Sequence, residues 1–252
     1  DLSYSNASST TRGATGDYSV AMGYNTTASG DYSTATGQAT IAGGNYSTAM
    51  GEGSEASGTS STATGRYTEA SGNYSTAMGK STVASGSRST ATGGSTTASG
   101  DYSTATGYSA EASGGFSTAT GNDTTASGES STAMGRSTKA IGIYATALGT
   151  STEARGSYST AMGSQAIAQG NGSTAIGNTT VANGVSSTAM GINTTASDYG
   201  SLVIGQYNSS GSTPTSANTF NTANTAFVIG SGVDSSNKAD AFKVLFNGNT
   251  TI

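Results

Sequence analysis

The chain has 252 residues and a net charge of −5, with nine Lys and Arg residues scattered singly, which argues against nucleic-acid binding. It contains no Cys, His or Trp, which excludes disulfides, thiolate nucleophiles and zinc–thiolate sites and removes the commonest general base. No run of eighteen apolar residues is present, so we expect no direct membrane insertion by this segment.

Glycine recurs at every seventh position from Gly16 to Gly191, and an alanine stands two residues before each of these glycines. A fixed short period is typical of a solenoid, in which each unit buries its faces by stacking on the next. Two kinds of heptad alternate, so the unit is fourteen residues. A heptads read like Asp31-Tyr-Ser-Thr-Ala-Thr-Gly37, and B heptads read like Tyr24-Asn-Thr-Thr-Ala-Ser-Gly30.

Each heptad leaves room for a strand of four or five residues and a turn of two or three. The sequence therefore predicts an all-β roll with two strands in every fourteen-residue coil. We expect glycine to supply the positive φ that the turns need. These turn glycines are Gly16, Gly23, Gly30, Gly37, Gly44 and Gly51, and their successors at the same spacing.

Alternation within the strands assigns their faces. In B heptads the alanine position and the one two before it are always small, as in Thr26 and Ala28, whereas the position between them carries charges such as Glu69. In A heptads the corresponding pair is again small, as in Ser33 and Ala35. We predict that the small residues fill a narrow interior and that the charged B positions face water.

The outward face of the A strands is different, because it carries no charge. One row is threonine from Thr34 to Thr188, and the second row holds all six methionines. That second row includes Met22, Thr36, Met50, Thr64, Met78, Met134, Leu148, Met162, Ile176, Met190 and Ile204.

An interior of Ala, Ser and Thr methyl groups buries little apolar area to set against the entropy cost of ordering the backbone. We therefore predict an obligate oligomer with the A strands lining its axis. The alternative is a monomeric roll with a weakly apolar side.

One position, five residues before the A-heptad glycine, collects aromatic residues. Its members are Tyr18, Tyr32, Tyr46, Tyr74, Tyr102, Phe116, Tyr144 and Tyr158. Such a row suits stacking on sugars, but it also suits packing along the roll or sealing a subunit boundary. Asp17, Asp31 and Asp101 stand just before tyrosines of this row. They recur singly, and because calcium needs six or more oxygens gathered at one point, we predict a turn role.

Other activities find little support. The Thr-Ala-Thr runs at 90–92, 104–106 and 118–120 have the flat spacing that suits ice binding, but methionine or aliphatic residues interrupt the array. Glu55 and Glu69 lie one coil apart on a solvated strand, which is no cleft for paired carboxylates. We therefore expect no enzyme activity and no catalytic, cofactor-binding or metal-binding residues.

The seven-residue pattern becomes irregular after Gly191, since Asp198 stands where the next glycine is expected. A polar stretch that contains Pro214 follows, and then two strand-like runs at 226–230 and 241–246. Four of the five phenylalanines lie beyond this point, which suggests a small aromatic core. We predict a β-roll over residues 1–205 and a C-terminal β cap or neck over residues 206–252.

Residues 5–205, through motifs such as Ser173-Thr-Ala-Ile-Gly177, resemble the YadA-like head repeats of trimeric autotransporter adhesins. The resemblance implies a left-handed parallel β-roll of 14-residue coils and a homotrimer. It also implies an extracellular position, on a cell surface whose outer membrane anchors the parent chain. Attachment to a host-cell, matrix or glycan receptor would be its function.

Residues 199–252 lack the family's usual neck and are more similar to bacteriophage tail-fibre segments. A phage or viral appendage on a virion surface is therefore one alternative, and a purely structural shaft is another.

Overall fold

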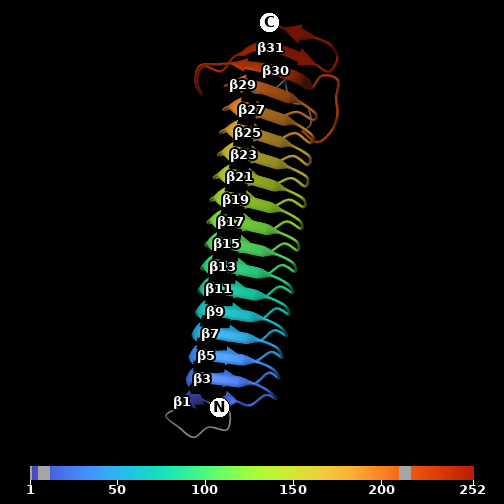
Figure 1. Ribbon diagram of the computed structural model, residues 1–252. Helices are drawn as coiled ribbons and strands as arrows, with labels where there is room; N and C mark the ends of the chain where they lie inside the picture. The colour runs from blue at the N-terminus through green and yellow to red at the C-terminus, as the bar shows by residue number, and fades with distance from the viewer. Residues whose placement is uncertain (1, 5–11, 210–216) are drawn as a thin grey trace. The chain divides into compact units, whose positions relative to one another are not determined.

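The computed structural model describes residues 2–4, 12–209 and 217–252, and within these ranges it contains strands and turns but no helix (Figure 1). The chain forms two compact units, one ending at Asp123 and one beginning at Thr124. Pro214 lies outside the described residues. The predicted all-β parallel solenoid of fourteen-residue coils is confirmed.

The first unit contains long strands from the A heptads and short strands from the B heptads. Its long strands are β1 (Leu2–Tyr4), β3 (Val20–Tyr24), β5 (Thr34–Gln38), β7 (Thr48–Glu52), β9 (Thr62–Arg66), β11 (Thr76–Lys80), β13 (Thr90–Gly94), β15 (Thr104–Tyr108) and β17 (Thr118–Asn122). Its short strands are β2 (Gly13–Ala14), β4 (Thr27–Ala28), β6 (Ile41–Ala42), β8 (Glu55–Ala56), β10 (Glu69–Ala70), β12 (Val83–Ala84), β14 (Thr97–Ala98) and β16 (Glu111–Ala112).

The second unit repeats this arrangement and adds three strands. Its long strands are β19 (Thr132–Arg136), β21 (Thr146–Thr150), β23 (Thr160–Ser164), β25 (Thr174–Asn178), β27 (Thr188–Ile192) and β29 (Leu202–Gln206). Its short strands are β18 (Thr125–Ala126), β20 (Lys139–Ala140), β22 (Glu153–Ala154), β24 (Ile167–Ala168), β26 (Val181–Ala182) and β28 (Thr195–Ala196). The added strands are β30 (Thr225–Ser231), β31 (Asp240–Leu245) and β32 (Thr250–Thr251).

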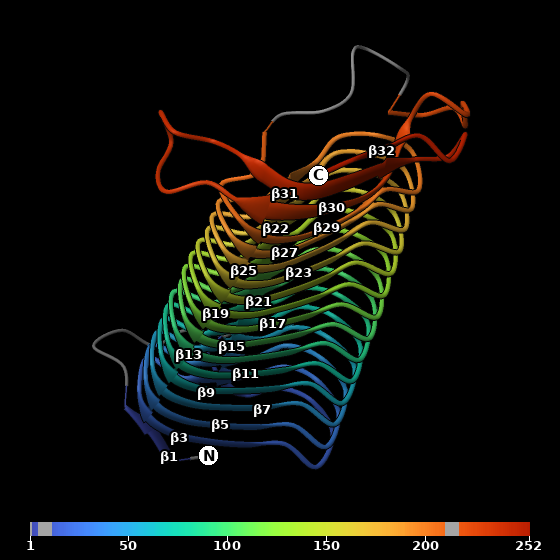
Figure 2. The ribbon, with the colours of Figure 1, turned by 90° about the horizontal axis from the view of Figure 1, so that it is seen from above.

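Long strands pair in parallel with long strands, and short with short. Thr34 of β5 faces Thr48 of β7, and Ala28 of β4 faces Ala42 of β6, so each coil advances the register by fourteen residues. Viewed from above, the coils are flattened loops around a narrow interior (Figure 2).

The B heptads form strands of two residues, so the predicted length of four or five residues is wrong for them. The backbone explains the difference. The amides of both Ser29 and Gly30 donate to the carbonyl of Ala42, at 2.9 and 3.2 Å, so the chain turns away immediately after the alanine.

The interior consists of the small residues that alternation assigned to it. Ser33 and Ala35 of the A side and Thr26 and Ala28 of the B side have no exposed surface. Because no inward side chain of the repeats is larger than threonine until Val203, the two sides of each coil approach closely. The predicted facing is confirmed.

The repeat glycines have a different role from the predicted one. Gly37 has a φ of +120°, but it lies inside β5, and Gly44 has no positive φ. A Cβ on either would lie 2.0–2.1 Å from the carbonyl oxygen of the glycine one coil on, so both positions need glycine for close stacking. The turns instead place Tyr18, Asn25 and their equivalents at positive φ, at 56° in both cases. Of the glycines predicted to supply the positive φ of the turns, Gly16, Gly30 and Gly44 have no positive φ, whereas Gly23, Gly37 and Gly51 have one but lie within strands.

The end of the second unit carries the two predicted strand-like runs as β30 and β31. β30 continues the parallel sheet beside β29, with Val203 facing Val228, and β31 then pairs antiparallel with β30. β31 turns through Asn247 and Gly248 into β32. The expected aromatic core is only half-formed, because Phe220 and Phe246 meet edge to face at 5.0 Å but are 54% and 37% exposed.

Asp198 joins the last coil to these strands. It follows β28, the last short strand, so no further coil presses on its position and a side chain fits where earlier coils need glycine. Its carboxylate accepts a hydrogen bond from the amide of Thr225 at 2.8 Å, at the start of β30, and only 3% of the residue is exposed.

We expect Asp198→Ala to loosen β30 and β31, because the buried Thr225 amide loses its acceptor at a cost of about 1–3 kcal/mol. Hydrogen exchange of residues 225–231 and 240–245 should quicken by about tenfold, while exchange in β19 to β25 stays unchanged. Asp198→Asn keeps an acceptor oxygen and is the matched control. Equal protection in wild type and Asp198→Ala would contradict this role.

Candidate interaction surfaces

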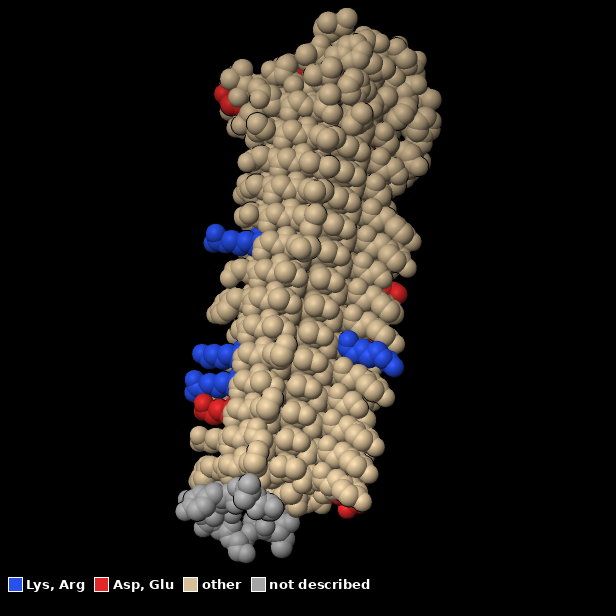
Figure 3. Space-filling model, in the orientation of Figure 1, with Lys and Arg blue, Asp and Glu red and all other residues tan. Residues whose placement is uncertain are grey.

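The outward side chains of the long strands form an uncharged face in each unit. We call its second position, from Met22 to Ile204, the methionine row. The row is open to solvent in the single chain: Met22 is 41% exposed, Met78 41% and Met134 44%. Figure 3 shows this face with Lys, Arg, Asp and Glu only along its margins. Its neighbouring row of threonines is half-buried.

Burial of the interior side chains contributes little stabilising free energy to offset the exposure of the methionine row. Many inward hydroxyls, such as those of Ser33, Thr40 and Ser47, are buried without a hydrogen-bond partner. Burying a hydroxyl in this way costs free energy, and the alanines beside it contribute only one methyl group each. The methionine row is therefore a source of apolar burial that the repeats have left unused.

Charges border the uncharged face where the long strands end. Arg66 forms an ion pair with Glu52, with Nε 3.1 Å from Oε2, and its guanidinium lies 5.0 Å from the ring centre of Tyr67. Hydrogen bonding with Tyr67, and then the charge of Glu52, raise the pKa of Arg66 above its ordinary value. Both ionic side chains are about half exposed, so the pair contributes little to stability.

The short strands present the opposite kind of surface. Glu55, Glu69, Glu111 and Lys139 are exposed, as the alternation predicted. Glu55 of β8 faces Glu69 of β10 in the parallel register, so two carboxylates lie side by side on a flat strand surface. Such a surface has no enclosed volume in which a carboxylate could act as an acid or base.

The aromatic residues form stacked groups in the turns that precede the long strands. Tyr18, Tyr32 and Tyr46 stack with ring centres 5.0 Å apart and interplanar angles of 14° and 2°. Tyr102 stacks on Phe116 at 4.8 Å, and Tyr144 on Tyr158 at 5.1 Å. We call this row the aromatic ladder. Tyr32 has a ring stacked on both faces, whereas the rings at the ends of each group have one face without a ring.

Two residues that sequence reasoning passed over belong to the same row. The guanidinium of Arg88 lies between the rings of Tyr74 and Tyr102, 5.1 and 5.2 Å from their centres, and its Nη1 donates to the Tyr102 hydroxyl at 2.9 Å. Ser60 occupies the position between Tyr46 and Tyr74. The fourteen-residue spacing could have placed both residues in the ladder.

The turn aspartates bind the backbone of the preceding coil. Asp31 accepts a hydrogen bond from the amide of Asp17 at 3.0 Å, and Asp101 accepts one from Ser87 at 2.9 Å. Asn45 makes the same bond to Asp31, so the position needs an acceptor oxygen and not a charge. Among the described residues, no three acidic side chains gather as a metal site would require.

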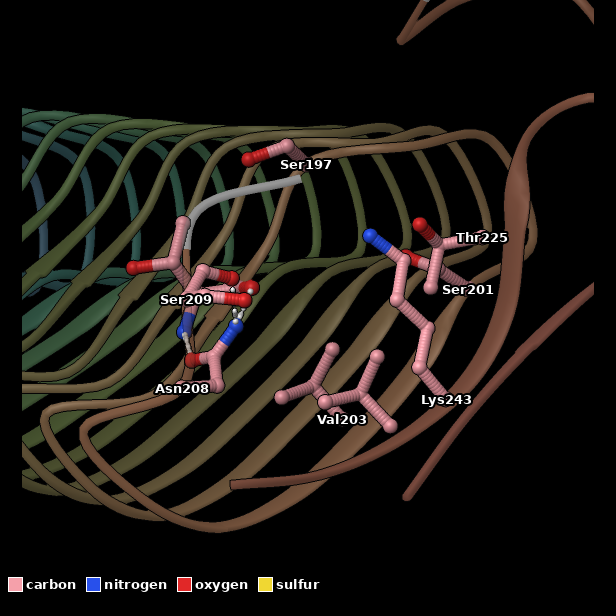
Figure 4. Close-up of a pocket in the computed structure, with 9 residues that line it drawn as sticks. Ser197, Ser201, Val203, Asn208, Ser209, Thr225 and Lys243 are labelled. Atoms are coloured by element: carbon pink, nitrogen blue, oxygen red, sulfur yellow. Dashed lines mark hydrogen bonds between the residues drawn. The ribbon is translucent and has the colours of Figure 1, made fainter. Parts of the chain in front are cut away.

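A cavity of about 10 Å³, the size of one water molecule, lies where the last coil meets β30 and β31. Figure 4 shows Lys243 of β31 reaching over Val203 toward Ser201 and Thr225. Asn208 closes the other side, accepting from the Thr195 amide at 2.7 Å and donating to the Thr195 carbonyl at 3.0 Å. This cavity therefore has room for a water molecule and not for a small-molecule ligand.

The repeats match a known protein family. A family model described as "YadA head domain repeat (2 copies)" matches residues 14–40, 42–68, 70–96, 98–124, 126–152, 154–180 and 182–208. No match to a curated protein was found. The family match ends at residue 208, so the likeness of residues 199–252 to tail-fibre segments stays a prediction. No helix among the described residues is long and apolar enough to cross a bilayer. Since the matches cover about three quarters of the sequence and coincide with the coils, the chain belongs to the YadA head repeat family, a structural family of adhesin type.

Proposed function

We propose that the chain forms a homotrimer through the methionine row and acts, without catalysis, as an adhesive head outside the cell. The trimer would project from a cell surface and attach it to host tissue, matrix or other cells. The observation that carries the proposal is the methionine row itself. It is uncharged over its whole length, and its methionines are 36–44% exposed in the single chain.

Burial supports self-association over a monomeric roll. Covering this row with the same row of another chain removes apolar surface from water in every second coil from Met22 to Met78 and in every coil from Met134 to Ile204. The same row on each chain makes the contact self-complementary, as closed symmetric assemblies require. The number three, and the left hand of the roll, come from the family likeness.

The association is tested by light scattering on the purified protein. We expect a particle of three 24.4 kDa chains whose mass does not change on dilution across the micromolar range. A stable monomer with the full β-sheet circular dichroism signal would contradict the proposal.

Attachment is tested on immobilised matrix proteins, a glycan array and whole cells. Repetition presents equivalent turns many times over three chains, so we expect avidity to exceed the affinity of a single chain. The comparison is between wild type and an assembly-defective variant at equal chain concentration. An assembled protein that binds none of these surfaces would instead support a structural shaft.

A further inference from the structure

The aromatic ladder of the first unit is interrupted at two positions, Ser60 and Arg88, and only Ser60 leaves the space empty. Ser60 follows the same turn path as its neighbours, with a φ of 56°, and its amide donates to the carbonyl of Asn45 at 2.8 Å. The Tyr74 amide donates to Thr59 in the same way, also at 2.8 Å. The backbone therefore keeps its spacing through this coil, and only a ring is missing between Tyr46 and Tyr74.

The next break in the ladder shows what fits such a space. Arg88 stands between Tyr74 and Tyr102, and its guanidinium lies 5.1 and 5.2 Å from the two ring centres. Two rings about 10 Å apart thus hold one planar cation between them. Tyr46 and Tyr74 flank Ser60 at the same two-coil separation.

The flanking rings at Ser60 each have an uncovered face. Tyr32, with a ring stacked on both sides, is 51% exposed, and Tyr102, between Phe116 and Arg88, is 47% exposed. Tyr46 and Tyr74 have a neighbour on one side only, and they are 60% and 56% exposed. Exposure alone does not separate the two groups, since Tyr144, with one stacked neighbour, is 50% exposed. The uncovered ring faces follow from the absence of a ring at Ser60.

The charged groups around the gap are two carboxylates, on the strands that lead into these turns, and the cation of Arg88 on the other face of Tyr74. Glu55 lies on the short strand that leads into the Ser60 turn, and Glu69 lies on the strand that leads into the Tyr74 turn. Both carboxylates are exposed, and among the described residues neither forms an ion pair. The turn itself contributes neutral Thr59, between Asn45 and Asn73 of the adjacent coils.

We propose that the gap at Ser60 is a binding site for a planar cation, the guanidinium of an arginine side chain on a partner polypeptide. The guanidinium enters between Tyr46 and Tyr74 as that of Arg88 does between Tyr74 and Tyr102. Its charge meets the two ring faces and the field of Glu55 and Glu69. The ends of the ladder expose only one ring face each, whereas the gap offers two. Ser130 has the same turn conformation in the second unit, with a φ of 55°, and is a further candidate position. The inference is independent of the adhesive function proposed above.

The probe is the blocked tripeptide Gly-Arg-Gly, titrated into the assembled protein while NMR follows the ring resonances of its tyrosines. We expect saturable shifts at Tyr46 and Tyr74 at millimolar peptide, since each exposed cation–π contact is weak. Blocked Gly-Lys-Gly should bind at least about threefold more weakly, because its ammonium is not planar and is more strongly hydrated.

Three variants complete the experiment. Ser60→Arg fills the gap from within and should abolish the shifts. Glu55→Gln combined with Glu69→Gln should weaken binding by about threefold. Arg88→Ser opens a matched second gap and should add saturable shifts at Tyr102. The proposal is overturned by shifts that persist in Ser60→Arg, by equal affinity for the two tripeptides, or by unshifted tyrosines in the wild-type protein.

Discussion

Met78→Lys is expected to leave the protein as separate chains. The substitution puts one charge into the methionine row of each chain, where assembly would bring like charges together and strip them of water. Burying such a charge without a partner costs about 3–5 kcal/mol, so association should weaken by more than about a hundredfold. Sedimentation velocity or light scattering across a dilution series measures the change.

Glu69→Lys is the matched control, because it also introduces a lysine, in the short strand that immediately precedes the strand of Met78. Glu69 lies on the exposed short-strand face, where a lysine remains solvated, and we expect the trimer to persist. Met78→Leu keeps the apolar volume and should also assemble. If Met78→Lys and Glu69→Lys behaved alike, the assignment of the two faces would be wrong.

Gly44→Ala is expected to destabilise the protein strongly, because the added methyl group would overlap the backbone of the next coil. Its Cβ would lie 2.1 Å from the carbonyl oxygen of Gly58 and 2.5 Å from the carbonyl carbon. These are backbone atoms, so no side chain can move aside and the two coils must separate locally. We expect a loss of about 1–3 kcal/mol per chain and a melting temperature about 4–10 °C lower.

Gly43→Ala, one residue earlier, provides the comparison. The nearest atom to its Cβ would be 3.9 Å away, its φ is not positive, and Ser29 and Ser57 occupy the same position in the adjacent coils. Alanine there restricts the unfolded chain and should be neutral or slightly stabilising. Calorimetry of the two variants measures the difference. If the Gly44→Ala protein were as stable as the Gly43→Ala protein, Gly44 would not be required for close stacking of the coils.

The alternation of side chains along each strand predicted which residues fill the interior. The pair Ser33 and Ala35 is small because it is enclosed, and Glu69 is charged because it is solvated, so a period of two suffices to assign them. The fourteen-residue period similarly placed the aromatic ladder in one row.

The structural role of the repeat glycines was harder to predict from the sequence, because a turn and a close backbone contact both favour glycine. The distinguishing signal is present in the sequence. Positions with positive φ accept Tyr18, Ala39 or Ser60, whereas the rows of Gly37 and Gly44 hold glycine in every coil until Asp198. The length of the short strands was also overestimated. These strands end where the amides of Ser29 and Gly30 share the carbonyl of Ala42, and that contact depends on the path of the backbone and not on a residue type.

The glycine contacts have a consequence for how such a gene changes in length. Each coil meets its neighbours through the same backbone contacts, as when Gly37 meets Gly51 and Gly51 meets Gly65. An in-frame duplication or deletion of one whole coil therefore recreates joints that already exist, whereas any other insertion breaks one. Unequal recombination between the repeats would yield variants that contain more or fewer coils and keep every contact that determines the fold.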